Sequence, residues 1–515
     1  MRLSNTLFCG IVALVLATVA LLQISSVRQE AQTWDEAVYI SAGYTYWKTG
    51  DFRLNSEHPP LAKLLVAAPL LFLDLALPLD DPAWQKADEY AFGARFLYKN
   101  RLPADTILFA SRSVTIFVTL LFGLVIVWWM RRRAGPIAAI VALILFAFDP
   151  NIIAHGRYAT NDFYLAFFFF VTVILWNRAL RLGRPTDYAL AGCALGLAVC
   201  SKLSGVLLVP AAALIAFSRP PEVRSLARGA AISALAALAI VAVLYHGQIY
   251  HYRDVLRDSV DHARGGQLAY LFGSTFRHGH WYFYPAVAAV KTPIAVFVLI
   301  ALTAVAIVRR KRLAPDSLAL FLPATLYAIV CVASPIDLGI RILLPIYPLL
   351  YAFVALNLPL PQWRWAVAAC LALLVAESTM VYPNYLAFFN VLAGGPAQGP
   401  RYLLDSNIDW GQDTKKLKAY LQARGVRGAC TAYFGTAYPF YYGIVQLPWP
   451  RYVNPSDIPK LDCVVAVSVT WLYGGPAIAG PTWGWLRAQV PDARIGYSIY
   501  VYDFRKHPAS SLRAP

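Results

Sequence analysis

The residues best suited to chemistry lie in segment 34–63, just after the first apolar run of the chain. Asp35 and Glu36 stand side by side, and Glu57 and His58 come shortly before Lys63. Ionisable groups close to a membrane are costly to hold, so such a group needs a functional or a pairing explanation. A carboxylate can act as a general base when it reaches the proton of an attacking hydroxyl. We therefore interpret the segment as a catalytic loop with Asp35 as base, in preference to a polar loop that only caps a helix bundle.

Cations within this segment and elsewhere in the chain could complete such a site. They are Lys63, Arg112, Lys202 and Arg341. Each lies near an end of an apolar run that the topology predicted below places on the outer side of the membrane. Such cations can hold a phosphate and stabilise the charge that develops on it as it leaves. Asp162 lies at the same side and is a further catalytic candidate, although Arg157 and Asp162 could instead form a structural pair. The set suits a reaction between an anionic donor carried by a lipid and an acceptor from outside.

Other polar residues at these ends are candidates for substrate positioning, and they are Glu57, His58, His278 and His280. Carboxylate and imidazole groups are common metal ligands, so Glu57 and His58 could bind a divalent metal with one of the other histidines. No fixed ligand spacing supports such a site. We therefore assign no metal residues, leave a divalent metal open, and find no other cofactor indicated.

The elements that must position these residues are membrane helices. Of the 515 residues, 59% are hydrophobic, against roughly 45–50% in soluble domains. The net charge of +17 suggests a nucleic-acid partner, but no motif supports one, and we predict none. We predict instead an all-α polytopic membrane bundle of about eleven transmembrane helices. The predicted spans are 7–24, 107–130, 136–154, 162–180, 188–201, 203–217, 228–246, 285–308, 317–333, 341–359 and 364–382.

The positive charge is concentrated in short turns between apolar runs, at 131–133, 178–184, 219–228 and 309–312. Short basic turns mark the cytoplasmic side of a membrane protein. The first loop, residues 25–106, contains more acidic than basic residues, so we place it outside. Within it, residues 61–78 are apolar but interrupted by proline and aspartate, and we expect a helix at the membrane interface.

Residues 383–515 differ in composition from the transmembrane domain expected at 1–382. A helix is predicted from about Asp409 to Gly425. Stretches rich in β-branched and aromatic residues predict strands within 428–435, 461–474 and 493–504. We therefore expect a small α/β lobe on the extracytoplasmic side.

The first outer loop resembles a known family. Asp35-Glu36, followed by Glu57-His58-Pro59-Pro60-Leu61-Ala62-Lys63, is similar to the Asp-Glu pair and the His-Pro-Pro-Leu-x-Lys motif of protein O-mannosyltransferases. It is more loosely similar to bacterial aminoarabinose lipid A transferases. The segments GRYATND, HWYFYP and RILLPIYP and the segment around Lys202 also look like their family counterparts. YLLDSNIDWGQD looks like bacterial members that depend on polyprenyl phosphate.

The resemblance implies an inverting membrane glycosyltransferase of the type C fold. The donor would be a polyprenyl-phosphate sugar, the acceptor a glycan, lipid or protein, and the location the outer face of a bacterial inner membrane. The base role would fall to Asp35 with Glu36 beside it, and a positioning or acid role to Asp162. Donor-phosphate contacts would fall to Lys63, Arg112 and Lys202.

A transporter or flippase of a lipid-linked sugar is the alternative function. Such a protein should show inverted repeats and ionisable groups near the middle of the bilayer. In this sequence the ionisable groups gather at the outer ends of the predicted spans. This placement favours an enzyme.

Overall fold

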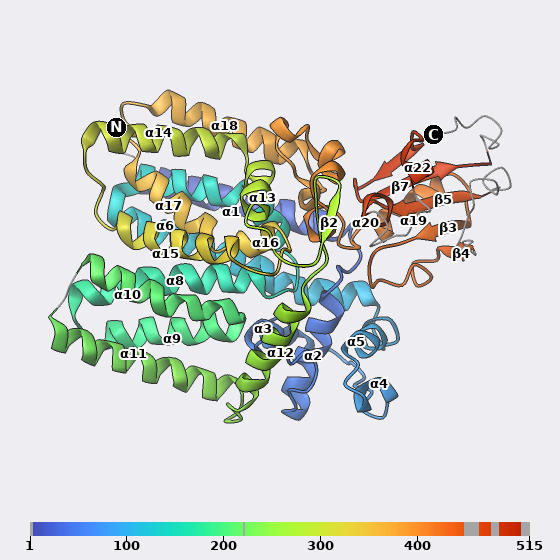
Figure 1. Cartoon of the computed structure of the whole chain (residues 1–515), viewed down its shortest axis with the longest axis horizontal. Helices are drawn as coiled ribbons and strands as arrows, with labels where there is room; N and C mark the ends of the chain where they lie inside the picture. Colours follow the sequence, from blue (N-terminus) through green and yellow to red (C-terminus); the bar gives the residue numbers. More distant parts are fainter. Residues whose placement is uncertain (1–3, 220–221, 448–462, 475–483, 506–515) are drawn as a thin grey trace.

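The computed structural model describes residues 4–219, 222–447, 463–474 and 484–505. Most of its helices run along the long axis of the molecule, and a β-sheet stands at one end (Figure 1). An apolar run in hydrocarbon is expected to form a helix, because a helix satisfies its backbone hydrogen-bonding groups within the segment. The predicted mostly helical architecture is confirmed.

The long helices coincide with the apolar runs of the sequence. Their bounds are α1 (Asn5–Val27), α6 (Ala104–Ala147), α7 (Pro150–His155), α8 (Asp162–Leu182), α9 (Pro185–Ser201), η2 (Leu203–Leu207), α10 (Leu208–Ser218), α11 (Val223–Leu244), α13 (Phe283–Lys291), α14 (Ile294–Arg310), α15 (Ser317–Val332), α16 (Ile340–Leu343), α17 (Ile346–Asn357) and α18 (Arg364–Met380). α6 has two limbs that meet at Gly135, whose φ of 84° only glycine adopts readily. These limbs correspond to the predicted spans 107–130 and 136–154.

Four of the described helices are long and apolar enough to cross a membrane, namely α1, α6, α8 and α11. A fifth span results if α13 and α14, which meet at a bend of 105°, are counted together. Shorter apolar helical segments, such as Ser317–Val332 and Ile346–Asn357, add to these. The chain is therefore a multi-pass membrane protein, while the number of eleven spans stays a prediction.

One buried carboxylate, Asp316, forms ion pairs with arginines from three of the four basic turns. Its oxygens lie 3.4 Å from Arg133 Nε, 3.6 Å from Arg181 Nη1 and 3.3 Å from Arg219 Nη1. The side chain of Asp316 is only 2% exposed. These turns therefore lie at one end of the helical bundle, as the predicted topology requires.

The first outer loop folds into short helices packed on one another. They are α2 (Glu36–Thr49), α3 (Leu61–Ala67), η1 (Ala68–Phe72), α4 (Pro82–Gln85) and α5 (Glu89–Tyr98). α2 contacts α3 at Gly43, where an added Cβ atom would stand 1.9 Å from the carbonyl oxygen of Lys63. Glycine at this crossing therefore lets the two backbones touch.

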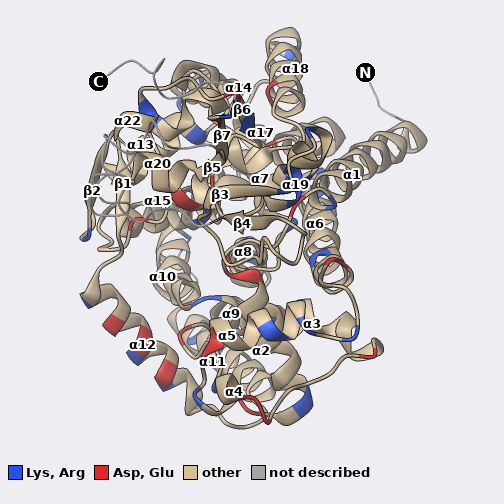
Figure 2. Cartoon of the chain, turned by 90° about the vertical axis from the view of Figure 1, so that its right-hand side faces the viewer, with Lys and Arg blue, Asp and Glu red and all other residues tan. Residues whose placement is uncertain are grey.

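A further helix, α12 (His251–Gly265), lies beside the first outer loop and was not anticipated from the sequence. It carries both acidic and basic residues, coloured red and blue in Figure 2. Asp258 of this helix accepts a hydrogen bond from Ser56 at 2.7 Å, and Ser259 donates one to the Glu57 carbonyl at 3.4 Å. A short antiparallel hairpin of β1 (Ala269–Leu271) and β2 (Ser274–Phe276) follows.

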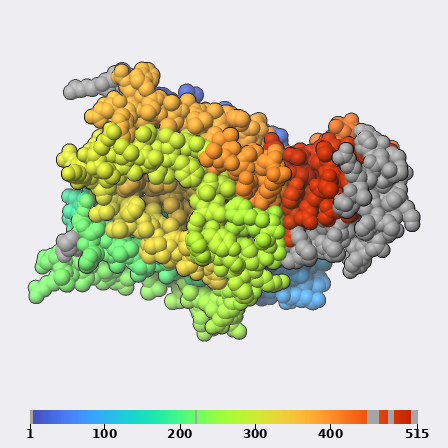
Figure 3. All heavy atoms as spheres, turned by 45° about the horizontal axis from the view of Figure 1, so that its top comes forward, coloured from blue at the N-terminus to red at the C-terminus, as the bar shows by residue number. Residues whose placement is uncertain are grey.

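The C-terminal part contains a five-stranded mixed sheet in the order β4-β3-β5-β7-β6. Its elements are α19 (Thr414–Ala423), β3 (Gly428–Ala432), β4 (Val445–Leu447), β5 (Val464–Ser468), α20 (Val469–Tyr473), α22 (Gly484–Arg487), β6 (Ala493–Ile495) and β7 (Ile499–Asp503). β3 pairs in parallel with β4 and β5, and β7 pairs antiparallel with β5 and β6. Figure 3 shows this part, in red, at one end of the molecule. The domain boundary at residue 383 stays a prediction.

The helix predicted from about Asp409 begins only at Thr414, so that predicted start is wrong. Gly411 has a φ of 87°, which ends any helical path at this point. The preceding residues pair with the first loop instead. Ala31 N donates to Gln412 O at 2.8 Å, and Trp34 N donates to Trp410 O at 2.9 Å.

Candidate active site

Four charged side chains from separate parts of the chain form an ionic cluster, which we define as Asp35, Asp162, Lys202 and Arg341. Arg341 Nη1 lies 3.1 Å from Asp35 Oδ2 and 3.6 Å from Asp162 Oδ2. Lys202 Nζ lies 2.5 Å from Asp162 Oδ1. The structure thus brings together four of the residues proposed from the sequence, with positive and negative charges alternating.

Each member of the cluster stands at a helix end. Asp35 directly precedes α2, Asp162 is the first residue of α8, and Arg341 lies in the short helix α16. Lys202 occupies the break between α9 and η2, where its extended backbone (φ −157°, ψ 147°) interrupts the helix. Helix ends leave backbone groups unsatisfied, which makes them suitable places for a polar site.

Two buried atoms of the ionic cluster have no hydrogen-bond partner among the described residues, Arg341 Nε and Asp162 Oδ2. Leaving a buried polar atom unpaired costs about 1–3 kcal/mol, so natural proteins rarely do so without a reason. The side chains of Asp35, Lys202 and Arg341 are 21%, 17% and 13% exposed. The cluster is therefore partly accessible through these side chains, and the buried Arg341 Nε–H is a donor without a partner among the described residues.

Asp35 has the environment of a base. Burial raises the pKa of its carboxyl group above the ordinary value, and the Arg341 guanidinium opposes that rise. A higher pKa makes a carboxylate a stronger acceptor of a proton. Asp35 accepts a hydrogen bond from Arg341 at 3.1 Å, and the Asp35 side chain remains partly exposed.

Glu36 lies in a wholly different environment. Its side chain is fully buried, and it binds the Arg112 guanidinium through Nε at 2.8 Å and Nη2 at 2.6 Å. The backbone N–H groups of Thr33 and Ala159 also donate to it, at 2.8 and 3.0 Å. Burial acts to raise the pKa of Glu36, but Arg112 and the backbone donors outweigh it and hold the pKa below its ordinary value. This pair anchors the loop beside Asp35.

Arg112 and Lys63 are saturated by protein contacts. Besides Glu36, Arg112 donates to three backbone carbonyls of residues 27–31. Lys63 Nζ donates to Tyr46 Oη at 2.9 Å and to the carbonyls of Asn55 and His58, both at 2.7 Å. Neither side chain is more than 2% exposed. Their role as donor-phosphate contacts stays a prediction, and the structure places both in the support of the first loop.

The residues considered for substrate positioning lie in two places. His58 is half-buried beside Tyr39, with 5.8 Å between the ring centroids, and Glu57 Oε1 lies 3.7 Å from its Nε2. Burial, followed by the charges of Lys202 and Lys63, lowers the pKa of His58 well below its ordinary value, so the imidazole is neutral. His58 therefore lies within electrostatic range of Lys202.

His278 and His280 belong to the loop that follows β2. The backbone N–H of His280 donates to Asp337 at 2.9 Å, and its ring packs against Phe276 with 4.2 Å between the ring centroids and the planes tilted by 50°. The second histidine near Glu57, after His58, is His262 of α12, whose Nδ1 lies 4.0 Å from Glu57 Oε2. Within the described ranges, no group of three or more His, Cys, Asp and Glu side chains is arranged to hold a metal ion.

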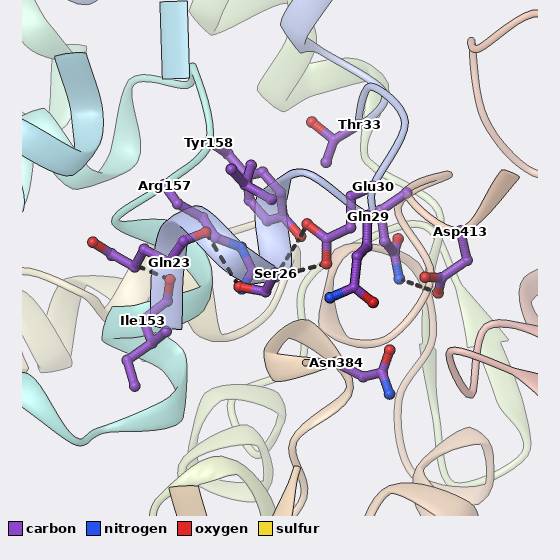
Figure 4. A network of polar contacts seen from close by, with 12 residues as sticks. Gln23, Ser26, Gln29, Glu30, Thr33, Ile153, Arg157, Tyr158, Asn384 and Asp413 are labelled. Atoms are coloured by element: carbon purple, nitrogen blue, oxygen red, sulfur yellow. Dashed lines mark hydrogen bonds and ion pairs between the residues drawn. The ribbon is translucent and has the colours of Figure 1, made fainter. Parts of the chain in front are cut away.

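Arg157 does not pair with Asp162, so that alternative is wrong. Its guanidinium binds Glu30 Oε1 at 2.7 Å and Ser26 Oγ at 2.5 Å, and Tyr158 donates to the same carboxylate at 3.0 Å. Figure 4 shows these residues converging at the end of α1. Asp162 has nearer cations in Lys202 and Arg341, which leaves Arg157 to fix the beginning of the first loop.

Sequence reasoning missed Trp410, although the segment DSNIDWGQD drew attention as a resemblance. The Arg341 guanidinium lies over the Trp410 ring, 4.7 Å from its centroid. The concentration of acidic residues and an aromatic ring in a short non-apolar stretch is the signal that points to this segment. A residue of the C-terminal part of the chain therefore packs directly against the ionic cluster.

Comparison with known proteins places these observations in a family context. The model of the dolichyl-phosphate-mannose-protein mannosyltransferase family matches residues 11–219, a segment that includes the first outer loop, Asp162 and Lys202. The resemblance drawn from that loop is confirmed by this match, which indicates a glycosyltransferase. No curated protein sequence matches the chain.

The fold is similar to that of ArnT from Cupriavidus metallidurans. The structure of that protein bound to undecaprenyl phosphate superposes with a TM-score of 0.52 at 14% identity, covering 98% of this chain and 99% of the other. The apo structure gives a TM-score of 0.54 at the same identity and coverage. The type C glycosyltransferase fold expected from the sequence is therefore shared along nearly the whole chain.

Proposed function

From the family match and the shared fold, we propose that this chain is an inverting glycosyltransferase with the ionic cluster as its active site. It would move a sugar from a polyprenyl phosphate to an acceptor. ArnT, the structural relative, has been solved with undecaprenyl phosphate, which supports a donor of this class. The observation that carries the proposal is the cluster itself, in which a partly exposed carboxylate stands beside cations with an unused donor.

The chemistry is a single displacement at the anomeric carbon of the sugar. Asp35 takes the proton of an acceptor hydroxyl while the oxygen forms a bond to that carbon. The bond from the carbon to the donor phosphate breaks on the opposite face, and the polyprenyl phosphate leaves with the electron pair. The configuration inverts because attack and departure take place on opposite faces.

Arg341 and Lys202 are the proposed phosphate contacts. Cations placed where negative charge develops lower the barrier, and they are most effective in a partly desolvated site. Asp162 is the proposed positioning residue, because it lies 2.5 Å from Lys202 and 3.6 Å from Arg341 and so holds the two cations side by side. Asp35 is preferred over Glu36 as base, since Glu36 is buried and fully engaged by Arg112.

The proposed location is the extracytoplasmic face of a bacterial inner membrane. α8 begins at Asp162 in the ionic cluster and ends beside Arg181, which binds Asp316 among the basic turns. If the basic turns face the cytoplasm, as short basic turns generally do, the cluster faces the opposite side. The acceptor remains a glycan, a lipid or a protein. A transporter is less well supported, because the predicted topology puts these charges at the outer ends of the spans and not near the middle of the bilayer.

The test compares Asp35→Asn and Lys202→Met with the natural chain in lipid nanodiscs. Asp35→Asn should bind donor lipid normally but transfer sugar at least about 100-fold more slowly, because general-base catalysis contributes about 10²–10⁴-fold. Lys202→Met should weaken binding of polyprenyl phosphate about tenfold or more, because hydrogen bonds to charged groups contribute about 1.5–3 kcal/mol. Radiolabelled polyprenyl-phosphate mannose and glucose serve as donor probes.

The matched control is Asp74→Asn, which makes the same change at a side chain that is 76% exposed and forms an ion pair with Arg101. It should retain both binding and transfer. Transfer by Asp35→Asn at the rate of this control would remove Asp35 as base. Failure of the natural chain to bind either donor lipid would overturn the proposed function.

A further inference from the structure

The segment 405–413 is fastened directly to the helix that carries Arg341. Asn407 Oδ1 accepts a hydrogen bond from Ile340 N at 3.0 Å, at the beginning of α16. Gly339 has a φ of 110°, and an added Cβ atom there would lie 2.1 Å from Asn407 Oδ1. Lys291 Nζ donates to the Asn407 carbonyl at 2.7 Å. The position of α16 is therefore set by a residue of the C-terminal part.

The same segment also holds the loop that precedes Asp35. Trp34 N donates to Trp410 O at 2.9 Å, and Ala31 N donates to Gln412 O at 2.8 Å. The Trp410 ring lies against Arg341 at 4.7 Å. One short segment thus contacts Arg341 through the Trp410 ring and binds, through its backbone, the loop that directly precedes Asp35.

Asp405 is the exception within this segment. All residues of 403–414 are buried except Asp405, which is half-buried. Its φ of 54° is left-handed, a conformation that costs free energy in a residue other than glycine and tends to be retained at functional sites. Ser406 N donates to its Oδ1 at 2.6 Å, and Asp405 N is bound to Thr470 Oγ1 at 3.3 Å. The fold therefore holds this carboxylate in a fixed and partly accessible position.

The charges that act on Asp405 are Arg341 of α16 and Asp35 of the first loop. Lys202, in contrast, lies beside Asp162 at the beginning of α8. Asp405 begins the short helix η6 (Asp405–Asn407), whose Asn407 side chain binds Ile340 N directly before Arg341, so Asp405 belongs to the segment on the C-terminal side of the cluster. Lys202 belongs to the membrane helices on the other side. Under the proposed function, the apolar chain of the donor belongs beside the membrane helices, which leaves the side of Asp405 for the acceptor.

We infer that Asp405 is a second carboxylate of the active site that contacts the acceptor, placed beside the Asp35–Arg341 pair by the fastening of residues 407–412. The inference rests on the proposed function and adds the residue that recognises the acceptor. A carboxylate there accepts hydrogen bonds, so it suits an acceptor that presents hydroxyl or amino groups.

The ionisation of Asp405 supplies a measurable signature. Burial raises the pKa of Asp405 to about 6, against the lowering effect of Arg341. The group loses its negative charge as the pH falls through about 6, so use of the acceptor should weaken over that range. The acid side of the pH profile should therefore contain an inflection near pH 6 that belongs to Asp405.

The experiment uses the full chain in nanodiscs with Asp405→Asn, because asparagine tolerates a left-handed backbone. Radiolabelled polyprenyl-phosphate mannose and glucose are the donor probes, and membranes from cells lacking the protein supply the acceptor. Asp405→Asn should raise the amount of acceptor membrane needed for half-maximal transfer about tenfold. Donor binding should change less than twofold, and the inflection near pH 6 should disappear.

Two further variants make the result specific. Asp405→Glu restores the charge and should restore an acid inflection. Asp261→Asn changes a carboxylate of α12 that is 58% exposed, and it should match the natural chain. If Asp405→Asn behaves like Asp261→Asn while Asp35→Asn is inactive, the inference about Asp405 fails alone. If the natural chain transfers no sugar, the proposed function fails and the inference falls with it.

Discussion

Adjacent residues of one loop have opposite surroundings at the start of α2. Asp35 is 21% exposed and has one cationic partner at hydrogen-bonding distance, Arg341. Glu36 is fully buried and accepts hydrogen bonds from Arg112, Thr33 and Ala159. A carboxylate with every lone pair engaged has little capacity to take a further proton. Chemistry and anchoring are thus divided between neighbouring side chains.

This division predicts different consequences of neutralising each carboxylate. Glu36→Gln leaves the buried Arg112 charge unpaired, and breaking a buried ion pair by removing one partner costs about 3–5 kcal/mol. The midpoint of thermal unfolding in detergent should fall clearly, while Asp35→Asn should leave it within a degree or two. Unfolding of both variants at the same temperature as the natural chain would refute the structural role of Glu36.

At the scale of elements, the position of the ionic cluster depends on the close contact between α2 and α3. An added Cβ atom on Gly43 would lie 1.9 Å from the carbonyl oxygen of Lys63. Because that atom belongs to the backbone, it cannot turn aside as a side chain does. The two helices must separate to accept even one methyl group, which would shift the segment that carries Asp35.

Gly43→Ala should therefore lower the free energy of unfolding by about 1–3 kcal/mol or more, the usual cost of overpacking. It should also reduce transfer without removing any ionisable group. Gly10→Ala is the matched control, since nothing lies within 4 Å of its added Cβ atom in α1, and alanine is favoured over glycine in a helix. If Gly43→Ala and Gly10→Ala had the same free energy of unfolding, the close contact between α2 and α3 would be contradicted. Thermal unfolding and donor transfer are the two measurements.

At the scale of the whole molecule, the helical bundle has two charged ends with different tasks. One end gathers arginines around Asp316, and the other holds the ionic cluster. α8 connects them, and its 21 residues correspond to about 30 Å at 1.5 Å per residue. Charges this far apart interact weakly at physiological ionic strength.

Asp316→Asn should therefore affect stability but not chemistry. The change removes the shared partner of Arg133, Arg181 and Arg219, whose side chains are 26%, 23% and 39% exposed. Solvent offsets part of the loss, so the expected cost is about 1.5–3 kcal/mol. The unfolding midpoint should fall, whereas the pH profile of transfer by the folded protein should keep its shape. A shifted pH profile would show that the two ends are coupled.

Much of the bundle and the ionic cluster follows from local sequence patterns. Apolar runs indicate the helices, and the arginine turns sort the helix ends into two sides, which puts Asp35, Asp162, Lys202 and Arg341 into one larger set of polar residues at the outer ends. Both signals are local, and in a membrane protein the hydrocarbon enforces them. The grouping of charges at one end therefore required no knowledge of tertiary contacts.

The features that escaped prediction depend on contacts between distant segments. Arg157 was considered as a partner of Asp162, but it binds Glu30 near the end of α1. The start of α19 is delayed because residues 410–412 bond to the first loop. α12 lacks the long apolar run that identifies a span, so the sequence pattern did not reveal it. None of these pairings leaves a periodic signal in the sequence.

The contact between the first loop and the C-terminal part also has a consequence for synthesis. Gln32 donates to Thr436 across 404 residues of sequence, and at about 5–20 residues per second a ribosome needs roughly 20–80 s to make that stretch. During this interval Asp35 has already left the ribosome, but the segment that holds it does not yet exist. A nascent chain therefore lacks the segment that holds the first loop, and the proposed active site is completed only when the C-terminal part has been made.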